Sequence, residues 1–214
     1  MTLLRNLFII LTAWMIGMAP AFSAEYKEGV HYTVLPAPQA TAHPDKIEVL
    51  EAFSFGCPHC YHFEPQLKAW IAKKPADVYV DHIPAEFNRF FTLMARVYYA
   101  ASVLGVEKSI HTALFDAIHR QRRDLRKLGA VADFMAEHGV DRDQFMKAAQ
   151  SFAVETKLRR ARALYPRYGV RGVPSMIVDG KYLVAADKNL PTEDMMKVVT
   201  FLVNKVRAEH KTAS

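Results

Sequence analysis

Cys57 and Cys60 are the only two cysteines in this chain of 214 residues, and Pro58 and His59 separate them. A disulfide between them would close a loop too short to add much stability, because that gain grows with the length of the closed loop. Thiol–disulfide exchange, in contrast, needs a thiolate within reach of a second sulfur. The spacing therefore predicts a redox-active pair rather than a structural disulfide.

The residues around Cys57 are expected to lower the pKa of its thiol. Cys57 stands where a predicted strand ends and a predicted helix begins, so unpaired N–H groups and the helix dipole favour a thiolate. Pro58 suits the first helical turn, and His59 can donate a hydrogen bond or carry positive charge. Since a stabilised thiolate favours the reduced form, the disulfide of such a pair is readily given away. Cys60, one helical turn further along, is expected to be the less exposed, resolving thiol.

A metal site is the main alternative for the cysteine pair. Zinc would need two more ligands, from histidines such as His62 or His82, and His62 is too close in sequence to complete a tetrahedron easily. Covalent haem attachment needs a histidine directly after the second cysteine, where this chain has Tyr61. We therefore expect neither a metal nor a cofactor.

The first 23 residues have the pattern of a secretory signal peptide. Arg5 and the amino terminus form a short positive region, and residues 7–18 are an apolar run. A retained membrane anchor is the alternative, but the run is shorter than the ~20 apolar residues that span a bilayer comfortably. Removal of residues 1–23 takes away one basic side chain, so the net charge falls from +6 to 27 − 22 = +5. We expect an exported, soluble mature chain.

The composition is that of an ordinary globular protein, with 51% hydrophobic and 23% charged residues. The positive net charge is compatible with a soluble protein, with nucleic-acid binding and with binding to a membrane surface, and it does not distinguish among them. The densest basic cluster, residues 120–127, lacks interleaved aromatic residues and any motif of a nucleic-acid-binding fold. We interpret it as a solvated surface and expect no nucleic-acid partner.

Hydrophobic periodicity predicts an α/β chain. The second predicted strand is apolar on both faces, as in the centre of a sheet, and Asp179-Gly180 is a strong hairpin signal. One helix is predicted at residues 58–71, with a kink at Pro65, and another at residues 192–207, near the end of the chain. The predicted strands are residues 31–35, 47–55, 78–83, 175–178 and 181–184.

The middle of the chain is predicted to be helical. Apolar residues recur at helical spacing over residues 90–104, before Gly105, and again over residues 110–118 and 131–139. Asp141 resembles the start of a capping box that opens a fourth helix, with Phe145 and Phe152 expected to face inward. A block of helices between strands and a hairpin suits a sheet-based domain interrupted by a helical insertion.

Two segments resemble the DsbA family of periplasmic thiol–disulfide oxidoreductases. They are residues 53–61 (Phe-Ser-Phe-Gly-Cys-Pro-His-Cys-Tyr) and residues 170–176 (Val-Arg-Gly-Val-Pro-Ser-Met), the latter followed by Asp-Gly-Lys-Tyr at 179–182. The resemblance, which runs over nearly the whole mature chain, implies a thioredoxin fold from residues 24–87 and 165–214, with residues 88–164 as an inserted helical domain. It also implies a cis peptide at Val173-Pro174 facing the cysteines, where the Val173 backbone could pair with an extended substrate strand.

Glu51 interrupts the apolar strand six residues before Cys57. A buried carboxylate without a partner is costly, and a solvated acid at a sheet edge is the alternative. In proteins of the resembled family an acid at this position lies beneath the active site, where it can relay the proton of the buried cysteine. They often pair it with a lysine of the next strand, but residues 78–82 of this chain include no lysine. The partner of Glu51, and with it the detailed role of Glu51, stays open.

We expect a monomeric periplasmic dithiol oxidase that forms mixed disulfides with reduced exported polypeptides through Cys57, and the resemblance supports this interpretation. The resemblance further implies reoxidation by a quinone-linked membrane protein, DsbB. A disulfide isomerase or reductase is one alternative, although relatives of that kind usually carry an extra dimerisation domain, for which there is no room before His31. The other alternative is a metal- or peptide-binding chaperone in which the cysteines only tether a ligand.

Overall fold

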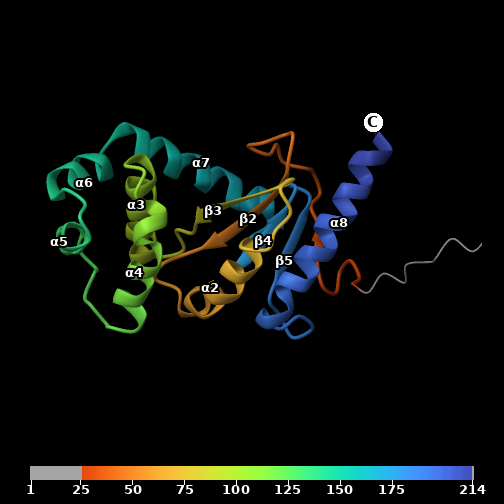
Figure 1. Ribbon diagram of the computed structural model, residues 1–214, viewed down its shortest axis with the longest axis horizontal. Helices are drawn as coiled ribbons and strands as arrows, with labels where there is room; N and C mark the ends of the chain where they lie inside the picture. Colours follow the sequence, from red (N-terminus) through yellow and green to blue (C-terminus); the bar gives the residue numbers. More distant parts are fainter. Residues whose placement is uncertain (1–25, 214) are drawn as a thin grey trace, which may run out of the picture.

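The computed structural model describes residues 26–213, which form a mixed five-stranded sheet, helices on both of its faces, and a helical region beyond one end (Figure 1). The strand order is β1-β5-β4-β2-β3, in which β2 and β3 are parallel and the other neighbours antiparallel. The predicted α/β class is confirmed. The strands are β1 Thr33–Val34, β2 Ile47–Phe53, β3 Val78–Pro84, β4 Ser175–Val178 and β5 Tyr182–Ala185.

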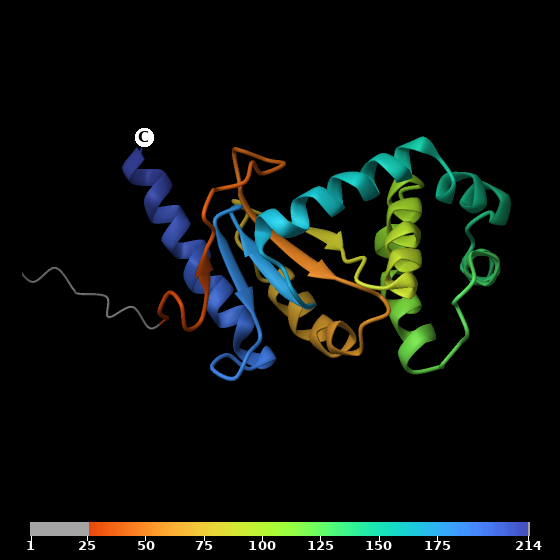
Figure 2. The ribbon, with the colours of Figure 1, turned by 180° about the vertical axis from the view of Figure 1, so that it is seen from behind.

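Two helices cover one face of the sheet and a third covers the other. α2 (Pro58–Ile71), which continues through Pro65, and α8 (Met195–Ala213) share one apolar core with the sheet. α7 (Phe152–Tyr168) packs on the opposite face. A short 3-10 helix, η1 (Thr192–Asp194), leads into α8. The remaining α-helices form the helical region, and Figures 1 and 2 show α7 running from it back to the sheet. They are α3 Arg89–Val103, α4 Glu107–His119, α5 Leu128–Glu137 and α6 Arg142–Ala149.

Strand β2 lies at the centre of this arrangement. All seven of its residues are buried, since β3 and β4 pair with its two edges and helices cover both faces. Leu50 and Ala52 contact the core under α7, whereas Ile47 and Val49 contact the core under α2 and α8. Side chains alternate along a strand, so Glu51 faces the helix that carries the cysteines.

The hairpin of β4 and β5 forms at the predicted residues. Asp179 and Gly180 have φ values of +53° and +59°, the left-handed conformation that a two-residue type I′ turn requires. A side chain at position 180 would also collide with the backbone carbonyl of Gln39. Glycine is therefore needed there for its conformation and for the close approach of another segment.

The fourth predicted helix is two helices. Asp141 caps α6 as predicted, since its carboxylate accepts a hydrogen bond from the Gln144 N–H at 2.7 Å. The prediction that Phe152 faces inward is wrong: it is the first residue of α7 and is 78% exposed, with the guanidinium group of Arg159 over its ring. The chain turns between α6 and α7, which breaks the periodicity that placed Phe145 and Phe152 on one face.

The structure bears on two further sequence predictions without testing them. α7 runs on to Tyr168, past residue 164, so the boundaries of the inserted domain stay a prediction. The predicted signal peptide, residues 1–23, lies outside the described residues. Within residues 26–213, no helix is both long enough and apolar enough to cross a membrane.

Candidate active site at the start of helix α2

Cys57 is the residue from which helix α2 starts. It occupies the N-cap position in an extended conformation, and Pro58 is the first residue of the helix. The Cys57 N–H donates to the carbonyl of Ser54 at 3.0 Å, which fixes the loop between β2 and α2. Cys57 and Cys60 are both free thiols, with exposed fractions of 5% and 1%. Cys60 is the deeper of the two, as predicted.

The helical region packs directly against this loop. A Cβ atom at Gly56 would lie 2.8 Å from a ring carbon of Phe90 in α3, closer than two carbon atoms approach. On α4, Nε2 of His119 lies 2.7 Å from the carbonyl oxygen of Phe55. Contacts from two helices of the insertion therefore position the loop that carries Cys57.

A second loop approaches Cys57 from across the sheet. The peptide bond between Val173 and Pro174 is cis, as the resemblance implied. The Sγ atom of Cys57 lies 3.4 Å from the carbonyl oxygen of Val173, close enough for its thiol to donate a hydrogen bond. This contact joins residues that are 116 positions apart and brings both predicted signature segments into one site.

The pKa of the Cys57 thiol is lowered to about 6. The largest cause is a hydrogen bond from the thiol of Cys60; burial opposes it, and the backbone N–H groups of Cys60 and His59 add to it. The charge of His59 contributes least among these causes. Sequence analysis predicted the direction correctly from the helix terminus and His59, but it did not identify the second cysteine as the main cause.

Cys60 has the opposite electrostatic environment. Burial raises the pKa of its thiol, and the hydrogen bond that this thiol donates to Cys57 raises it further. Negative charge on Glu51 or Cys57 adds to the effect, because it disfavours a second negative charge nearby. The two sulfurs therefore differ in chemical character: Cys57 readily carries a negative charge, and Cys60 holds its proton. Such an unequal pair is suited to exchange in one preferred order.

Glu51 is not a solvated acid at a sheet edge. It is 1% exposed on the central strand, and burial raises the pKa of its carboxyl group well above the usual range, with Glu64 raising it further. The β3 residue opposite Glu51 is His82, whose Nε2 lies 3.3 Å from the Glu51 Oε2 atom. That oxygen makes no hydrogen bond to any of the described residues. Burial also lowers the pKa of His82, to about 4, so the imidazole is neutral near pH 7.

A group of buried ionisable side chains beside Glu51 was not predicted. His111 of α4 lies between two carboxylates, with Nδ1 2.6 Å from Glu107 and Nε2 3.5 Å from Glu64. Burial disfavours the charged imidazole, but the contacts with Glu107 and Glu64 outweigh it and raise the pKa of His111 to about 9. Burial likewise raises the pKa of Glu64, yet His111 and Lys68 lower it to about 2. His111 and Glu64 are therefore both charged at neutral pH.

The position of Glu64 could have been inferred from the sequence. It follows Cys60 by four residues, and residues at this spacing share one face of a helix. Since Cys60 was expected to point inward, Glu64 should have been expected there too. No comparable signal identifies His111 as its partner, because the packing of α4 on α2 brings the two together.

Among the residues that the structure describes, no group of three or more His, Cys, Asp or Glu side chains is placed to hold a metal ion. Of the two histidines considered as zinc ligands, His62 is exposed on α2. His82 lies against Glu51 rather than against the cysteines.

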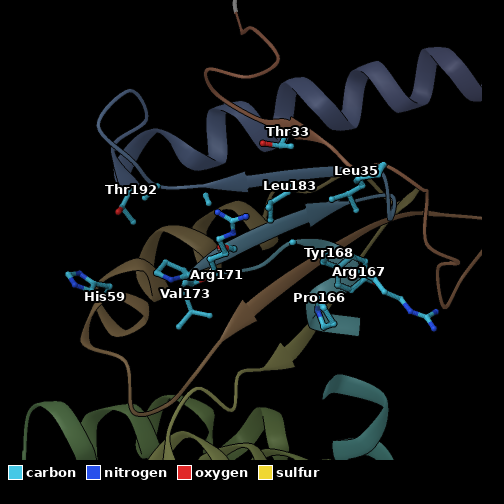
Figure 3. A pocket seen from close by; sticks show the side chains of 17 residues that line it. Thr33, Leu35, His59, Pro166, Arg167, Tyr168, Arg171, Val173, Leu183 and Thr192 are labelled. Atoms are coloured by element: carbon cyan, nitrogen blue, oxygen red, sulfur yellow. Dashed lines mark hydrogen bonds between the residues drawn. The ribbon is translucent and has the colours of Figure 1, made fainter. Parts of the chain in front are cut away.

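A groove of about 890 Å³ opens beside the two loops of the site (Figure 3). Its lining includes His59 from α2, the residues of the cis-proline loop, and parts of β1 and β5. Figure 3 shows His59 at one end, close to Val173, and Arg167 of α7 at the other. An extended chain lying in the groove would pass next to Cys57.

Exchange chemistry needs one reactive sulfur, one deeper sulfur, and a surface from which a second thiol can reach the first. Cys57 and Cys60 meet the first two requirements, and the groove beside Val173 meets the third. Set on this mixed sheet with its helical insertion, the site defines a thioredoxin-like thiol–disulfide oxidoreductase.

The DSBA-like thioredoxin domain family matches residues 48–195, and the chain belongs to this family. It is 38% identical to the thiol:disulfide interchange protein DsbA of Pseudomonas aeruginosa over 213 residues, which cover 97% of this chain and all of the relative. It is 39% identical to the protein of the same name from Azotobacter vinelandii, over 86% of each chain.

Solved structures agree with this assignment. The crystal structure of DsbA from Pseudomonas aeruginosa matches with a TM-score of 0.83 and 37% identity, over 88% of this chain and 98% of the other. The oxidoreductase DsbA from Xylella fastidiosa matches with a TM-score of 0.80 and 34% identity, over 86% and 98%. The predicted thioredoxin fold with a helical insertion is confirmed.

Proposed function

We propose that the protein is a dithiol oxidase, which donates a disulfide between Cys57 and Cys60 to reduced polypeptides outside the cytoplasm. The observation that carries this proposal is the inequality of the two thiols. The pKa of Cys57 is lowered to about 6, whereas burial raises the pKa of Cys60. A sulfur that is stable as a thiolate is a good leaving group, so a disulfide that contains it is a strong donor.

The transfer takes two exchanges. A substrate thiolate attacks Sγ of Cys57 in the disulfide; a mixed disulfide forms, and Cys60 leaves as a thiolate that takes up a proton. The second substrate thiolate then attacks the substrate sulfur of the mixed disulfide, and Cys57 leaves as a thiolate. The substrate loses two electrons in forming its disulfide, and the Cys57–Cys60 pair gains them.

Glu51 is proposed to exchange the proton of Cys60. Its raised pKa favours the protonated form of its carboxyl group, from which Cys60 can take a proton as that sulfur leaves. The two groups interact electrostatically, because the charge of Glu51 would raise the pKa of Cys60. Solvent would then return a proton to Glu51, because the pKa of this carboxyl group is raised in the reduced protein as well.

Substrate is proposed to bind as an extended segment alongside Val173, with the buried Pro174 fixing the loop that presents this backbone. Support comes from the 3.4 Å distance between the Val173 carbonyl and the Cys57 sulfur, the atom under attack. The exposed residues Pro58 and His59 flank the same sulfur at the start of α2. Backbone pairing of this kind accepts many sequences, as an oxidase of diverse polypeptides requires.

Several parts of the proposal rest on the sequence pattern and on family membership. The signal-like residues 1–23 support export to the periplasm, and the monomeric state follows the expectation from the sequence. We assign reoxidation of the reduced Cys57–Cys60 pair to a DsbB-like, quinone-linked membrane oxidase, which accepts the two electrons, because the relatives carry the DsbA name.

The decisive experiment measures the redox equilibrium of the purified protein against mixtures of reduced and oxidised glutathione. An oxidase should stay reduced until the mixture is far more oxidising than the one that half-oxidises a thioredoxin-type reductant. Cys57→Ser should abolish oxidation of a reduced peptide, and Cys60→Ser should accumulate a mixed disulfide with it. A strongly reducing equilibrium would support a reductase, and stoichiometric metal on the reduced protein without exchange activity would support the chaperone alternative.

A further inference from the structure

We propose that the groove beside the active site selects substrate segments that carry an acidic side chain close to the cysteine that attacks Cys57. This inference rests on the proposed function, because it concerns the substrate of the same site. It goes beyond backbone pairing, which carries no preference for charge.

The charge of the groove is one-sided. Its lining includes Arg167, Arg171 and His59, and neither Asp nor Glu is among its lining residues. Asp187 and Glu193 are each adjacent in sequence to a lining residue, but neither lines the groove itself. No carboxylate of the lining therefore offsets the charge of the two arginines.

The two arginines have no internal partner. Neither guanidinium group of Arg167 or Arg171 forms an ion pair or hydrogen bond with any of residues 26–213. Arg162, on the same helix as Arg167, shows the contrast: it binds the Glu86 carboxylate at 2.8 Å. Arg171 and Arg167 are exposed, so their charges remain available to a ligand in the groove.

Arg171 is the better placed of the two. Figure 3 shows its side chain rising from the loop before Pro174 toward β5, in the middle of the groove, with His59 beyond it on the side of the active site. Arg167 lies at the opposite end, and its side chain extends outward. A chain that leaves Cys57 along the groove would therefore pass Arg171 first.

The backbone spacing sets where the acidic residue should be. Arg171 precedes Val173, whose carbonyl contacts the Cys57 sulfur, by two residues. A segment paired with this loop would therefore place a residue about two or three positions from its cysteine opposite Arg171, since extended chains advance about 3.3 Å per residue. Only one direction along the segment leads past Arg171, so the preference should appear on one side of the cysteine.

The test uses short peptides with two cysteines, identical except for Glu, Gln or Lys at two or three positions before or after the first cysteine. The rate of oxidation by the oxidised protein is divided by the rate with oxidised dithiothreitol, which corrects for the effect of the charge on the peptide's own thiol. At low ionic strength the Glu peptide should react about three- to tenfold faster than the Lys peptide on the preferred side. Added salt should reduce this ratio, because exposed charges are screened.

Variants of the groove give the second arm of the experiment. Arg171→Gln should bring the Glu/Lys rate ratio close to one, Arg171→Glu should invert it, and Arg171→Lys should preserve most of it. Lys147→Glu is the matched control, because it makes the same change in net charge as Arg171→Glu. Lys147 is an exposed residue of α6, in the helical region away from the sheet (Figure 1). The Lys147→Glu variant should leave the ratio as in the wild type.

The outcomes separate this inference from the proposed function. If the wild-type protein oxidises all three peptides at one corrected rate, or if Lys147→Glu changes the ratio as much as Arg171→Glu, the charge selection is overturned and the oxidase stands. If the wild-type protein oxidises no peptide, and its equilibrium with glutathione is that of a reductant, the proposed function fails. That equilibrium does not depend on how peptides bind.

Discussion

His82 occupies, on strand β3, the position directly opposite Glu51 of β2, and its Nε2 atom lies 3.3 Å from Oε2 of that carboxyl group. The imidazole therefore stands on the strand where the family resemblance led us to look for a lysine. Unlike a lysine, it does not supply a positive charge near neutral pH, because burial lowers the pKa of His82 to about 4. The same burial raises the pKa of Glu51 well above its usual range. The pair is an acid whose protonated form is favoured beside a neutral imidazole, with the His82 side chain 18% exposed at the sheet edge.

Glu51→Gln should stabilise the oxidised protein at neutral pH by on the order of 1 to 3 kcal/mol, because a desolvated acid is replaced by a group that cannot ionise. The folded pKa of Glu51 is raised, so its destabilising effect appears as pH rises above the unfolded value of about 4.3. The gain should therefore disappear near pH 4. Urea unfolding of the wild type and of Glu51→Gln, at neutral pH and near pH 4, measures this difference in stability. The exposed Glu28→Gln should show no such pH-dependent gain.

The same variant should slow the chemistry that moves the Cys60 proton. Without a carboxyl group at position 51, the leaving Cys60 thiolate has to take its proton from water, in a site where Cys60 is 1% exposed. We expect the formation of mixed disulfide to slow by about tenfold or more, within the usual range for a lost general acid. Stopped-flow mixing of the oxidised protein with a reduced peptide measures this rate. An unchanged rate in Glu51→Gln would remove Glu51 from the proton pathway.

Cys60→Ala should raise the pKa of Cys57 more than His59→Ala does. The hydrogen bond from Cys60 is the largest cause of the lowered Cys57 pKa, and the charge of His59 is the smallest of those identified. We expect a rise of about one pKa unit or more for Cys60→Ala and a smaller one for His59→Ala. The ultraviolet absorbance of the thiolate, followed as a function of pH, measures both. A larger effect of His59→Ala would show that the imidazole, rather than the thiol of Cys60, is the main cause of the lowered pKa.

The two signature segments and the hairpin at Asp179-Gly180 were predictable because short local patterns encode them. The burial of Cys60 followed from helical geometry in the same way. The partners of Glu51 were not predictable from local pattern, because the register between β2 and β3 decides that His82 stands opposite.

Longer-range packing accounts for the other differences. The contact of Cys57 with Val173 spans 116 positions, and only the resemblance placed these residues together. His111 meets Glu64 because α4 packs on α2, which no periodicity within either helix encodes. Phe152 was misplaced for the opposite reason: a helical pattern was extended across the turn between α6 and α7.

His111→Leu should strongly destabilise the protein, by about 3 to 5 kcal/mol at neutral pH, because Glu64 and Glu107 would lose the positive charge between them. Adding Glu64→Gln to this variant should recover part of the loss. In the wild type the folded pKa of His111 is raised to about 9, so its contribution is fully present below about pH 6.5 and lost as pH rises through 9. Denaturant unfolding between pH 6 and 10 tests both points. His62→Leu, at an exposed site on α2, is the control and should change stability little.

The reduced protein should be more stable than the oxidised protein at neutral pH. Its disulfide closes too short a loop to gain much from restricting the unfolded chain, whereas the reduced form has a Cys57 thiolate that only the folded state stabilises. The folded pKa of about 6 lies below the unfolded value of about 8.5, so this stability is fully present above the unfolded pKa and is lost as pH falls through 6. At pH 7 it amounts to on the order of 1 kcal/mol. Denaturant melts of both redox forms at pH 7.5 and pH 5 should show a gap that closes on acidification. By thermodynamic linkage, the free energy that stabilises the folded, reduced protein is also what makes its disulfide a strong oxidant. An oxidised form that is equally stable or more stable than the reduced form at pH 7.5 would therefore contradict the proposed oxidase function and favour a reductase.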